Sequence, residues 1–157
     1  MGLDFDFSRL DAQDILDLAV FVEEEARDHY EQLETWMRQG GSDEAAKFFG
    51  KMVVLEANHL KVVTDKRKAL FGDAPPRHTS NIAWEVEAPD YDSIGASLTL
   101  EQAFEIARGA EQRAHDYYAG AIDFATDPQV ADLLEELRKA ELEHLRLLDD
   151  WQSRLRP

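Results

Sequence analysis

The stretches LEANHL (residues 55–60) and AELEHL (residues 140–145) decide the predicted fold of this chain. Each places a glutamate three residues before a histidine, and the four residues are Glu56, His59, Glu141 and His144. Residues i and i+3 of an α-helix lie on one face, one turn apart, so each glutamate and its histidine can contact the same object. The spacing therefore predicts two helices that present matching pairs of ligand atoms.

A second repeated spacing precedes each of these stretches. Glu23 stands seven residues before Tyr30, and Glu111 stands seven residues before Tyr118. The surrounding sequences also match, because EEEARDHY begins at Glu23 and EQRAHDYY begins at Glu111. Residues i and i+7 share a helix face, two turns apart. The order Glu-x6-Tyr followed by Glu-x-x-His thus occurs twice, which indicates a duplicated helical hairpin.

Apolar residues recur every three or four positions along most of the chain, which is the period of an amphipathic α-helix. The predicted helices cover about residues 12–39, 43–71, 100–126 and 128–155. Gly40 and Gly72 end the first two helices, and Ser42 can cap the second. Thr99 opens the third helix with a capping box, and Pro128 takes the first position of the fourth.

The connection between the two hairpins, about residues 73–98, contains Pro75, Pro76 and Pro89. A structureless loop of this length is unusual inside a compact domain. A four-helix bundle whose hairpins are joined by one long crossover accounts for it. We therefore predict an all-α protein in which residues 1–157 form a single domain, built as a bundle of two helical hairpins.

Acidic residues fall on the predicted inward faces of these helices. Glu23 shares a stripe with Val22, and the inward stripe expected for the second helix passes through Leu55, His59 and Val62. A buried carboxylate without a partner costs several kcal/mol. Four inward glutamates would repel one another unless cations lay among them. Two divalent metal ions would balance their charge.

Four glutamates and two histidines are the predicted ligands of this metal site: Glu23, Glu56, His59, Glu111, Glu141 and His144. Mixed carboxylate and imidazole donors suit iron or manganese, and zinc less well. Bundles in which two helices each supply a Glu and two supply Glu-x-x-His are ferritin-like di-iron and di-manganese proteins. We predict two Fe ions per chain, with Mn as an alternative and Zn as a substitute that purification could introduce. No catalytic residue is predicted beyond these ligands.

Through these motifs the chain resembles the rubrerythrin branch of the ferritin-like superfamily, over roughly residues 12–155. The resemblance implies a ferritin-like bundle with a di-iron site in which Glu56 and Glu141 bridge the metals. It also implies four terminal ligands: Glu23, His59, Glu111 and His144. Tyr30 and Tyr118 would then donate hydrogen bonds to ligand carboxylates.

The chain departs from the rubrerythrin pattern in three respects. It has no cysteine, so the cysteine-rich rubredoxin domain that usually delivers electrons has no counterpart in these 157 residues. A separate electron-donor protein would have to replace it. Ala114 stands where rubrerythrins carry a further glutamate tied to iron movement during peroxide reduction. Leu55 and Ala140 stand directly before ligand glutamates, whereas many ferritins carry an acid before the glutamate of the fourth helix.

The overall charge excludes several kinds of partner. A formal net charge of −16 repels the phosphates of nucleic acids and anionic lipids, and it attracts cations. No apolar run approaches the ~18 residues of a membrane span, and the amino terminus lacks the pattern of a secretory signal. We expect a cytoplasmic protein without nucleic-acid or membrane partners, and the resemblance favours a homodimer.

The predicted function is to bind Fe²⁺ and oxidise it with O₂ or peroxide. The protein would be an oxidoreductase, either a ferroxidase or a rubrerythrin-like peroxidase, with a role in oxidative stress or iron handling. Two alternatives stay open: an iron-binding or iron-delivery module with little catalysis, and a metal-free acidic interaction domain. Ala114 is compatible with delivery, whereas intact ligand positions in all four helices argue against the metal-free domain.

Overall fold

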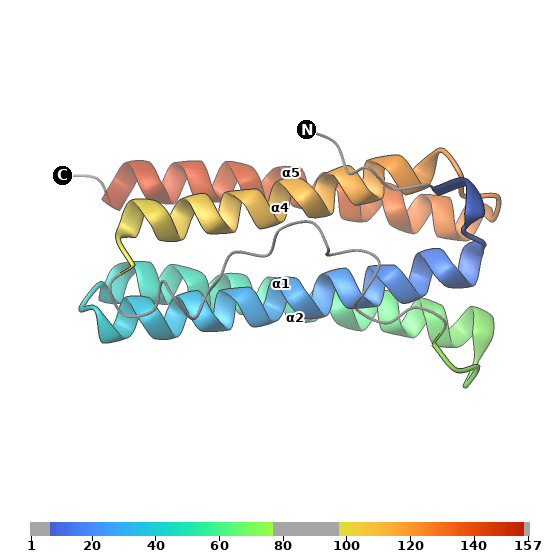
Figure 1. Ribbon diagram of the computed structural model, residues 1–157, viewed down its shortest axis with the longest axis horizontal. Coiled ribbons are helices and arrows are strands. Elements are labelled where there is room, and N and C mark those ends of the chain that lie inside the picture. Colours follow the sequence, from blue (N-terminus) through green and yellow to red (C-terminus); the bar gives the residue numbers. More distant parts are fainter. Residues whose placement is uncertain (1–6, 77–97, 156–157) are drawn as a thin grey trace.

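The computed structural model describes residues 7–76 and 98–155 (Figure 1). A short 3-10 helix, η1 (Phe7–Arg9), precedes four long helices. They are α1 (Ala12–Gln39), α2 (Asp43–Phe71), α4 (Leu100–Ile122) and α5 (Pro128–Leu155). The described residues contain no β-strand, and the prediction of an all-α four-helix bundle is confirmed.

The bundle consists of two helical hairpins, α1 with α2 and α4 with α5 (Figure 1). α2 ends and α4 begins at opposite ends of the bundle. This is the arrangement of a bundle with one long crossover. Of the crossover predicted over residues 73–98, the part from 77 to 97 lies outside the described residues.

One helix is shorter than the sequence predicts. The apolar pattern predicts a third helix up to residue 126, but α4 ends at Ile122. Phe124 and Ala125 each donate their backbone N–H to the carbonyl three residues back, so the chain tightens into turns there. Pro128 accounts for the early end, because it disfavours a helical conformation at Asp127, whose side chain instead caps the start of α5.

The other helix ends agree with the predicted caps in one case and differ in another. Thr99 and Gln102 each accept a hydrogen bond from the other's backbone N–H, so the predicted capping box is confirmed. Ser42 makes no capping hydrogen bond with its side chain, contrary to expectation. The backbone closes this turn instead, since Ser42 N–H donates to Met37 O at 2.7 Å and Gly41 takes a φ of 82°, which favours glycine.

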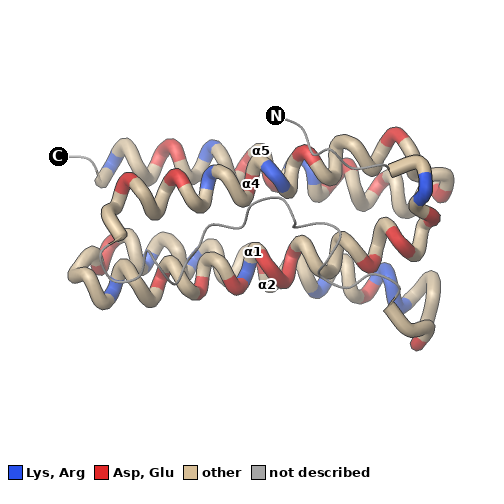
Figure 2. The backbone as a smooth tube through the Cα atoms, viewed as in Figure 1, with Lys and Arg blue, Asp and Glu red and all other residues tan. Residues whose placement is uncertain are grey.

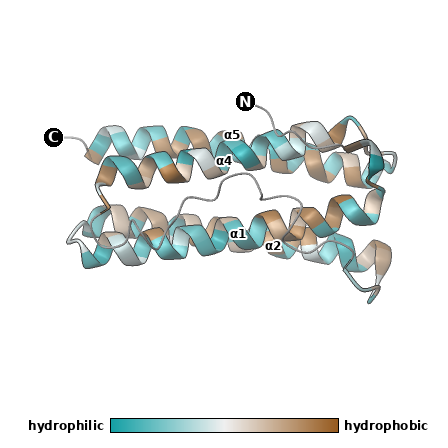
Figure 3. Ribbon diagram, in the orientation of Figure 1, coloured by the Kyte–Doolittle hydropathy of each residue, from teal (hydrophilic) through white to brown (hydrophobic). Residues whose placement is uncertain are grey.

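The apolar core is split into two clusters, one toward each end of the bundle. Large buried members of the first are Ile15, Leu16, Tyr117, Tyr118 and Leu134. Large buried members of the second are Leu33, Phe48, Phe49, Met52 and Phe104. The section between the clusters is more polar, and Figure 3 shows hydrophilic residues in the middle of α1. The predicted ligands lie in this middle section.

The inward face of α2 differs from the expected stripe. Val62, expected inside, is 48% exposed, whereas its neighbour Val63 is fully buried. Leu55 is only half-buried, and Glu56 next to it is fully buried. The apolar side chains of Leu55 and Val62 therefore predicted an inward face that is displaced by one residue from the observed face, which contains Glu56 and Val63. The inward residue at this turn of α2 is the acid.

Acidic residues are spread along all four helices and outnumber the basic ones, in keeping with the net charge of −16 (Figure 2). Some of these acidic residues are exposed on the surface of the bundle, and others are buried inside it. Within the described residues, none of the helices combines the length and the apolar character that crossing a membrane requires.

Candidate metal centre

The six predicted ligands lie near the middle of the four helices. α1 supplies Glu23, α4 supplies Glu111, and α2 and α5 each supply a Glu-x-x-His pair. Five of the six are buried, with at most 3% of their surface exposed: Glu23, Glu56, Glu111, Glu141 and His144. The sixth, His59, keeps 21% of its side chain exposed.

The ligand atoms of α2 and α5 converge on one point. One atom from each of four residues lies within 4.8 Å of the others: Glu56, His59, Glu141 and His144. The imidazole rings of the two histidines stack with their centroids 5.1 Å apart. The repeat in the sequence thus becomes a facing pair of ligand groups in space.

The other two glutamates each approach the histidine of their own hairpin. Glu23 Oε2 lies 3.8 Å from His59 Nδ1, and we call these two residues the first half-site. Glu111 Oε2 lies 3.3 Å from His144 Nδ1, and they form the second half-site. Glu56 reaches both, with Oε2 3.6 Å from His59 Nδ1 and Oε1 3.1 Å from His144 Nδ1. The structure therefore brings all six predicted ligands together.

Two buried tyrosines hold the outer glutamates from the opposite hairpin. Tyr30 of α1 donates a 2.5 Å hydrogen bond to Glu111 Oε1 on α4. Tyr118 of α4 donates a 2.6 Å hydrogen bond to Glu23 Oε1 on α1. Each hydroxyl fixes one oxygen of a carboxylate and leaves the second oxygen directed to other groups. The two tyrosines therefore orient the predicted ligands as well as filling the core.

Several ligand atoms are buried without a hydrogen bond. Among the described residues, five such atoms have no aligned partner: Glu23 Oε2, both carboxylate oxygens of Glu56, Glu141 Oε2 and His59 Nδ1. Buried polar atoms are nearly always bonded in folded proteins, because leaving one unbonded costs about 1–3 kcal/mol. These atoms belong to one cluster, and oxygen and imidazole donors of this kind suit Fe or Mn. The residues present therefore fit a site for divalent metal.

A model of the rubrerythrin family matches residues 14–151, which is most of the chain. The protein belongs to the rubrerythrin family. This match covers all six predicted ligands and both tyrosines, and it agrees with the resemblance inferred from the repeated motifs. No curated protein matches the chain.

Two solved structures resemble this rubrerythrin-family chain over most of its length. An uncharacterised conserved protein from Magnetospirillum magnetotacticum MS-1 is 25% identical, with a TM-score of 0.76, and the match covers 92% of this chain and 96% of that one. A candidate ferritin-like diiron-carboxylate protein from Thermotoga maritima is 23% identical, with a TM-score of 0.70, covering 92% and 95% of the two chains. These likenesses support the ferritin-like bundle.

Three glutamates of the cluster favour their protonated form. Burial, and next the charge of Glu56, raise the pKa of Glu23 well above its usual range. Burial and the charge of Glu111 act in the same way on Glu141. The same two causes raise the pKa of Glu56 to about 7. The cluster therefore holds protons at neutral pH when no cation is bound, and a bound cation would displace them.

The second half-site behaves as an ion pair. Burial alone would lower the pKa of His144, but the nearby carboxylates of Glu111 and Glu141 outweigh burial and raise it well above its usual range. Burial likewise opposes ionisation of Glu111, yet hydrogen bonds to Glu141 and His144 bring its pKa down to about 2. His59 differs, because burial lowers its pKa. One histidine of the cluster is thus charged and the other neutral.

The structure also locates the residue at which the sequence departs from the rubrerythrin pattern. Ala114 lies on α4, one turn after Glu111, and is buried. It packs in the first apolar cluster with Tyr117 and Tyr118. No further carboxylate is therefore available at this position of α4.

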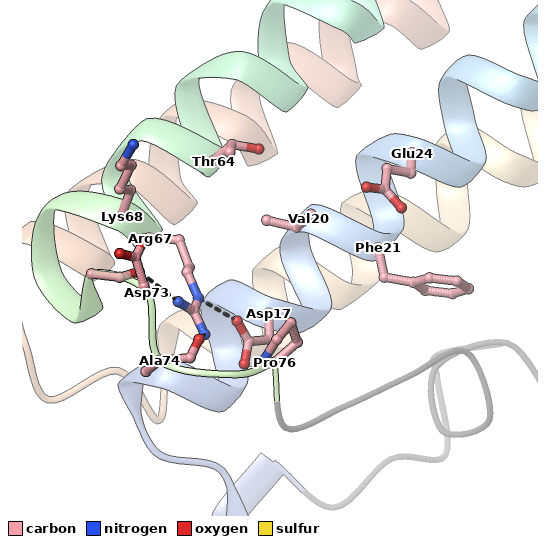
Figure 4. Close-up of a pocket in the computed structure, with 11 residues that line it drawn as sticks. Asp17, Val20, Phe21, Glu24, Thr64, Arg67, Lys68, Asp73, Ala74 and Pro76 are labelled. Atoms are coloured by element: carbon pink, nitrogen blue, oxygen red, sulfur yellow. Dashed lines mark hydrogen bonds and ion pairs between the residues drawn. The ribbon is translucent and has the colours of Figure 1, made fainter.

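An open hollow of about 550 Å³ lies between α1 and α2 (Figure 4). Arg67 lies at its base and donates to Asp17 Oδ1 at 2.7 Å, to Gly72 O at 3.0 Å and to Ala74 O at 2.6 Å. These bonds fix the chain that leaves α2 against the start of α1. None of the six ligands lines the hollow. Sequence reasoning assigns no role to Arg67, because a single arginine in a basic stretch carries no signal.

Proposed function

We propose that this rubrerythrin-family protein binds two Fe ions per chain and that Fe²⁺ held there is oxidised by O₂ or peroxide. Glu56 and Glu141 would bridge the two ions. Four residues would act as terminal ligands: Glu23, His59, Glu111 and His144. Tyr30 and Tyr118 would hold the outer carboxylates in position.

The observation that carries this proposal is the burial of four carboxylates around two imidazoles in the middle of an apolar bundle. Such a group is costly for a protein without a cation, because each buried charge loses its hydration. Two divalent ions would neutralise four carboxylates. An arrangement of this cost is retained at functional sites more often than in structural cores.

Bound iron would supply one-electron redox chemistry, and the protein would supply position and exclusion of water. Two bound ions would supply the two electrons that, with two protons, convert H₂O₂ into two molecules of water. The buried glutamates and tyrosines would keep the ligand geometry fixed, and the two apolar clusters would keep bulk water from both ends of the site. The activity would be that of a ferroxidase or a rubrerythrin-like peroxidase.

A second candidate is an iron-binding or iron-delivery module with slow oxidation. Ala114 favours it, because no additional glutamate is available next to Glu111 for the iron movement associated with peroxide reduction in rubrerythrins. The acidic surface is compatible with it as well, since a charge of −16 concentrates cations around the protein. Mn remains the alternative metal, and Zn a substitute acquired in purification.

The cellular setting is part of the same proposal. The protein would act in the cytoplasm, as a homodimer, with Fe²⁺ and O₂ or peroxide as small-molecule partners. Because these 157 residues contain no cysteine, a separate protein would deliver electrons if turnover needs them.

Stopped-flow oxidation of Fe²⁺ tests the proposal. Chelator-stripped protein is loaded with Fe²⁺ under anaerobic conditions and then mixed with O₂ or H₂O₂. We expect saturation near two Fe²⁺ per chain and rapid oxidation. Glu56→Ala and Glu141→Ala should lose the rapid phase. Glu136→Ala, at an exposed position of the same helix as Glu141, is the matched control and should keep it.

Two other outcomes would change the assignment. Binding of two irons with slow oxidation by either oxidant would favour the delivery module. Absence of specific metal binding would refute the proposal and leave the metal-free interaction domain.

A further inference from the structure

The two half-sites differ in their access to solvent. His59 of the first half-site keeps 21% of its side chain exposed, whereas His144 of the second keeps 4%. Both glutamates of the half-sites are buried, Glu23 completely and Glu111 to 2% exposure. The first half-site is therefore the one with an edge that solvent reaches.

The half-sites also differ in how their own atoms are bonded. Glu111 is bonded at both oxygens, by Tyr30 at Oε1 and by His144 at Oε2. Glu23 is bonded only at Oε1, by Tyr118, and its Oε2 has no aligned partner among the described residues. A cation in the second half-site has to break a 3.3 Å hydrogen bond between Glu111 and His144, whereas Glu23 and His59 of the first half-site are only in a looser contact of 3.8 Å.

We infer that a divalent cation enters and leaves through the first half-site, and that the second half-site fills later and releases its cation more slowly. This inference rests on the proposed two-metal function. It follows from the two differences together. His59 offers the solvent-facing ligand, and Glu23 Oε2 offers a buried oxygen that accepts no hydrogen bond from the described residues.

The exposed edge of His59 can be covered without changing any ligand. Val62 lies one turn further along α2, on the same side of the helix as His59, and is 48% exposed. A helical side chain leans toward the turn before it, so a larger group at position 62 lies over His59. Val54, which is 59% exposed, lies on a different side of α2 and serves as the matched control position.

The test is chelator extraction of Co²⁺ from protein loaded with two equivalents, followed by the visible absorbance of the bound ion. We expect two phases of equal amplitude in the unmodified protein. Val62→Trp should slow the fast phase several-fold, with two Co²⁺ still bound and the slow phase unchanged. Val54→Trp should leave both phases unchanged.

A second measurement assigns the phases. Just after mixing with one equivalent of Co²⁺, the spectrum of the unmodified protein should match that of His144→Ala, in which the first half-site is intact, and differ from that of His59→Ala. Should His144→Ala fail to fold, the extraction data with Val62→Trp still decide the matter.

The results separate this inference from the proposed function. Two bound Co²⁺ ions that leave in a single phase, or a fast phase that Val62→Trp does not slow, would overturn the ordered exchange and leave two-metal binding intact. A spectrum recorded just after mixing with one equivalent that matches His59→Ala would also overturn it. Absence of Co²⁺ binding would overturn both.

Discussion

Tyr30 and Glu111, which stand 81 positions apart in the sequence, share a 2.5 Å hydrogen bond in the buried centre of the bundle. Tyr118 and Glu23 form the corresponding bond in the opposite direction, at 2.6 Å. Each hairpin therefore contributes a tyrosine that holds a glutamate of the other hairpin. The geometry of the ligand cluster depends on how the two hairpins dock, and these two bonds fix that docking.

Tyr30→Phe should destabilise the metal-free protein by about 1–3 kcal/mol, because it removes the donor to a buried carboxylate. It should also weaken binding of Mn²⁺, because Glu111 is no longer held in its position. Urea denaturation and a Mn²⁺ titration of the same samples measure the two effects.

Tyr117→Phe is the control for Tyr30→Phe. Tyr117 is equally buried and donates a 2.9 Å hydrogen bond to the backbone carbonyl of Ile15, away from the ligands. Its loss should lower stability and leave Mn²⁺ affinity unchanged. Equal loss of affinity in both variants would mean that general loosening of the core, and not the position of Glu111, governs metal binding.

Much of the fold and the cluster follows from spacing along the chain. The Glu-x-x-His pairs place Glu56 with His59, and Glu141 with His144, because i and i+3 must share a helix face. A Glu and a Tyr seven residues apart share a face but lie two turns from each other. They cannot bond one another, so each needs a partner on another helix. Spacing alone does not say which one.

The remaining features depend on packing between helices. The unequal exposure of His59 and His144 arises from the docking of the hairpins, and the local motifs around the two residues are alike. The prediction that Val62 faces inward was wrong. The apolar side chains of α2 follow a line beside the inward face, and the buried acid Glu56 lies on the inward face itself. Hydrophobic periodicity misplaces a face whose central residue is polar.

The folding stability of the metal-free protein should fall as pH rises. A carboxyl whose pKa is higher in the folded state stabilises that state fully below its unfolded pKa, and the stabilisation is lost as pH rises through the folded pKa. Glu56, with a pKa raised from 4.5 to about 7, and Glu23 and Glu141, raised further by burial, all act in this direction. The lowered pKa of His59 acts oppositely, but only below 6.5.

The window to examine is therefore about pH 6.5 to 8. The Tm of chelator-treated protein should fall across it. The increase in Tm produced by Mn²⁺ should grow across the same window, because ligation requires the glutamates to lose their protons. A metal-free protein that becomes more stable toward pH 8 would show that these carboxyls are ionised without a cation.

Arg67→Met should destabilise the protein by about 3 kcal/mol, because it removes the guanidinium that faces the buried carboxylate of Asp17. The change also removes the bonds to Gly72 O and Ala74 O. None of the six ligands lines this hollow, so two Mn²⁺ should still bind. Thermal unfolding and metal stoichiometry check the two parts, and loss of one metal would reveal coupling between the hollow and the ligands.

Glu23→Gln should stabilise the metal-free protein and weaken the loaded one. At pH 8 the buried carboxyl of Glu23 must hold a proton that it lacks in the unfolded chain, and a neutral amide avoids this cost. The amide oxygen can still accept the hydrogen bond from Tyr118. The first half-site, however, loses its carboxylate.

The measurement is the Tm of Glu23→Gln at pH 8, with and without Mn²⁺. Glu136→Gln, which changes an exposed glutamate of α5, is the control and should alter neither Tm. A Tm that rises without Mn²⁺ and falls with Mn²⁺, relative to the unmodified protein, would mean that Glu23 is kept for cation binding at the expense of stability. A variant that is less stable without metal, and gains as much from Mn²⁺ as the unmodified protein, would instead identify Glu23 as a structural acceptor for Tyr118.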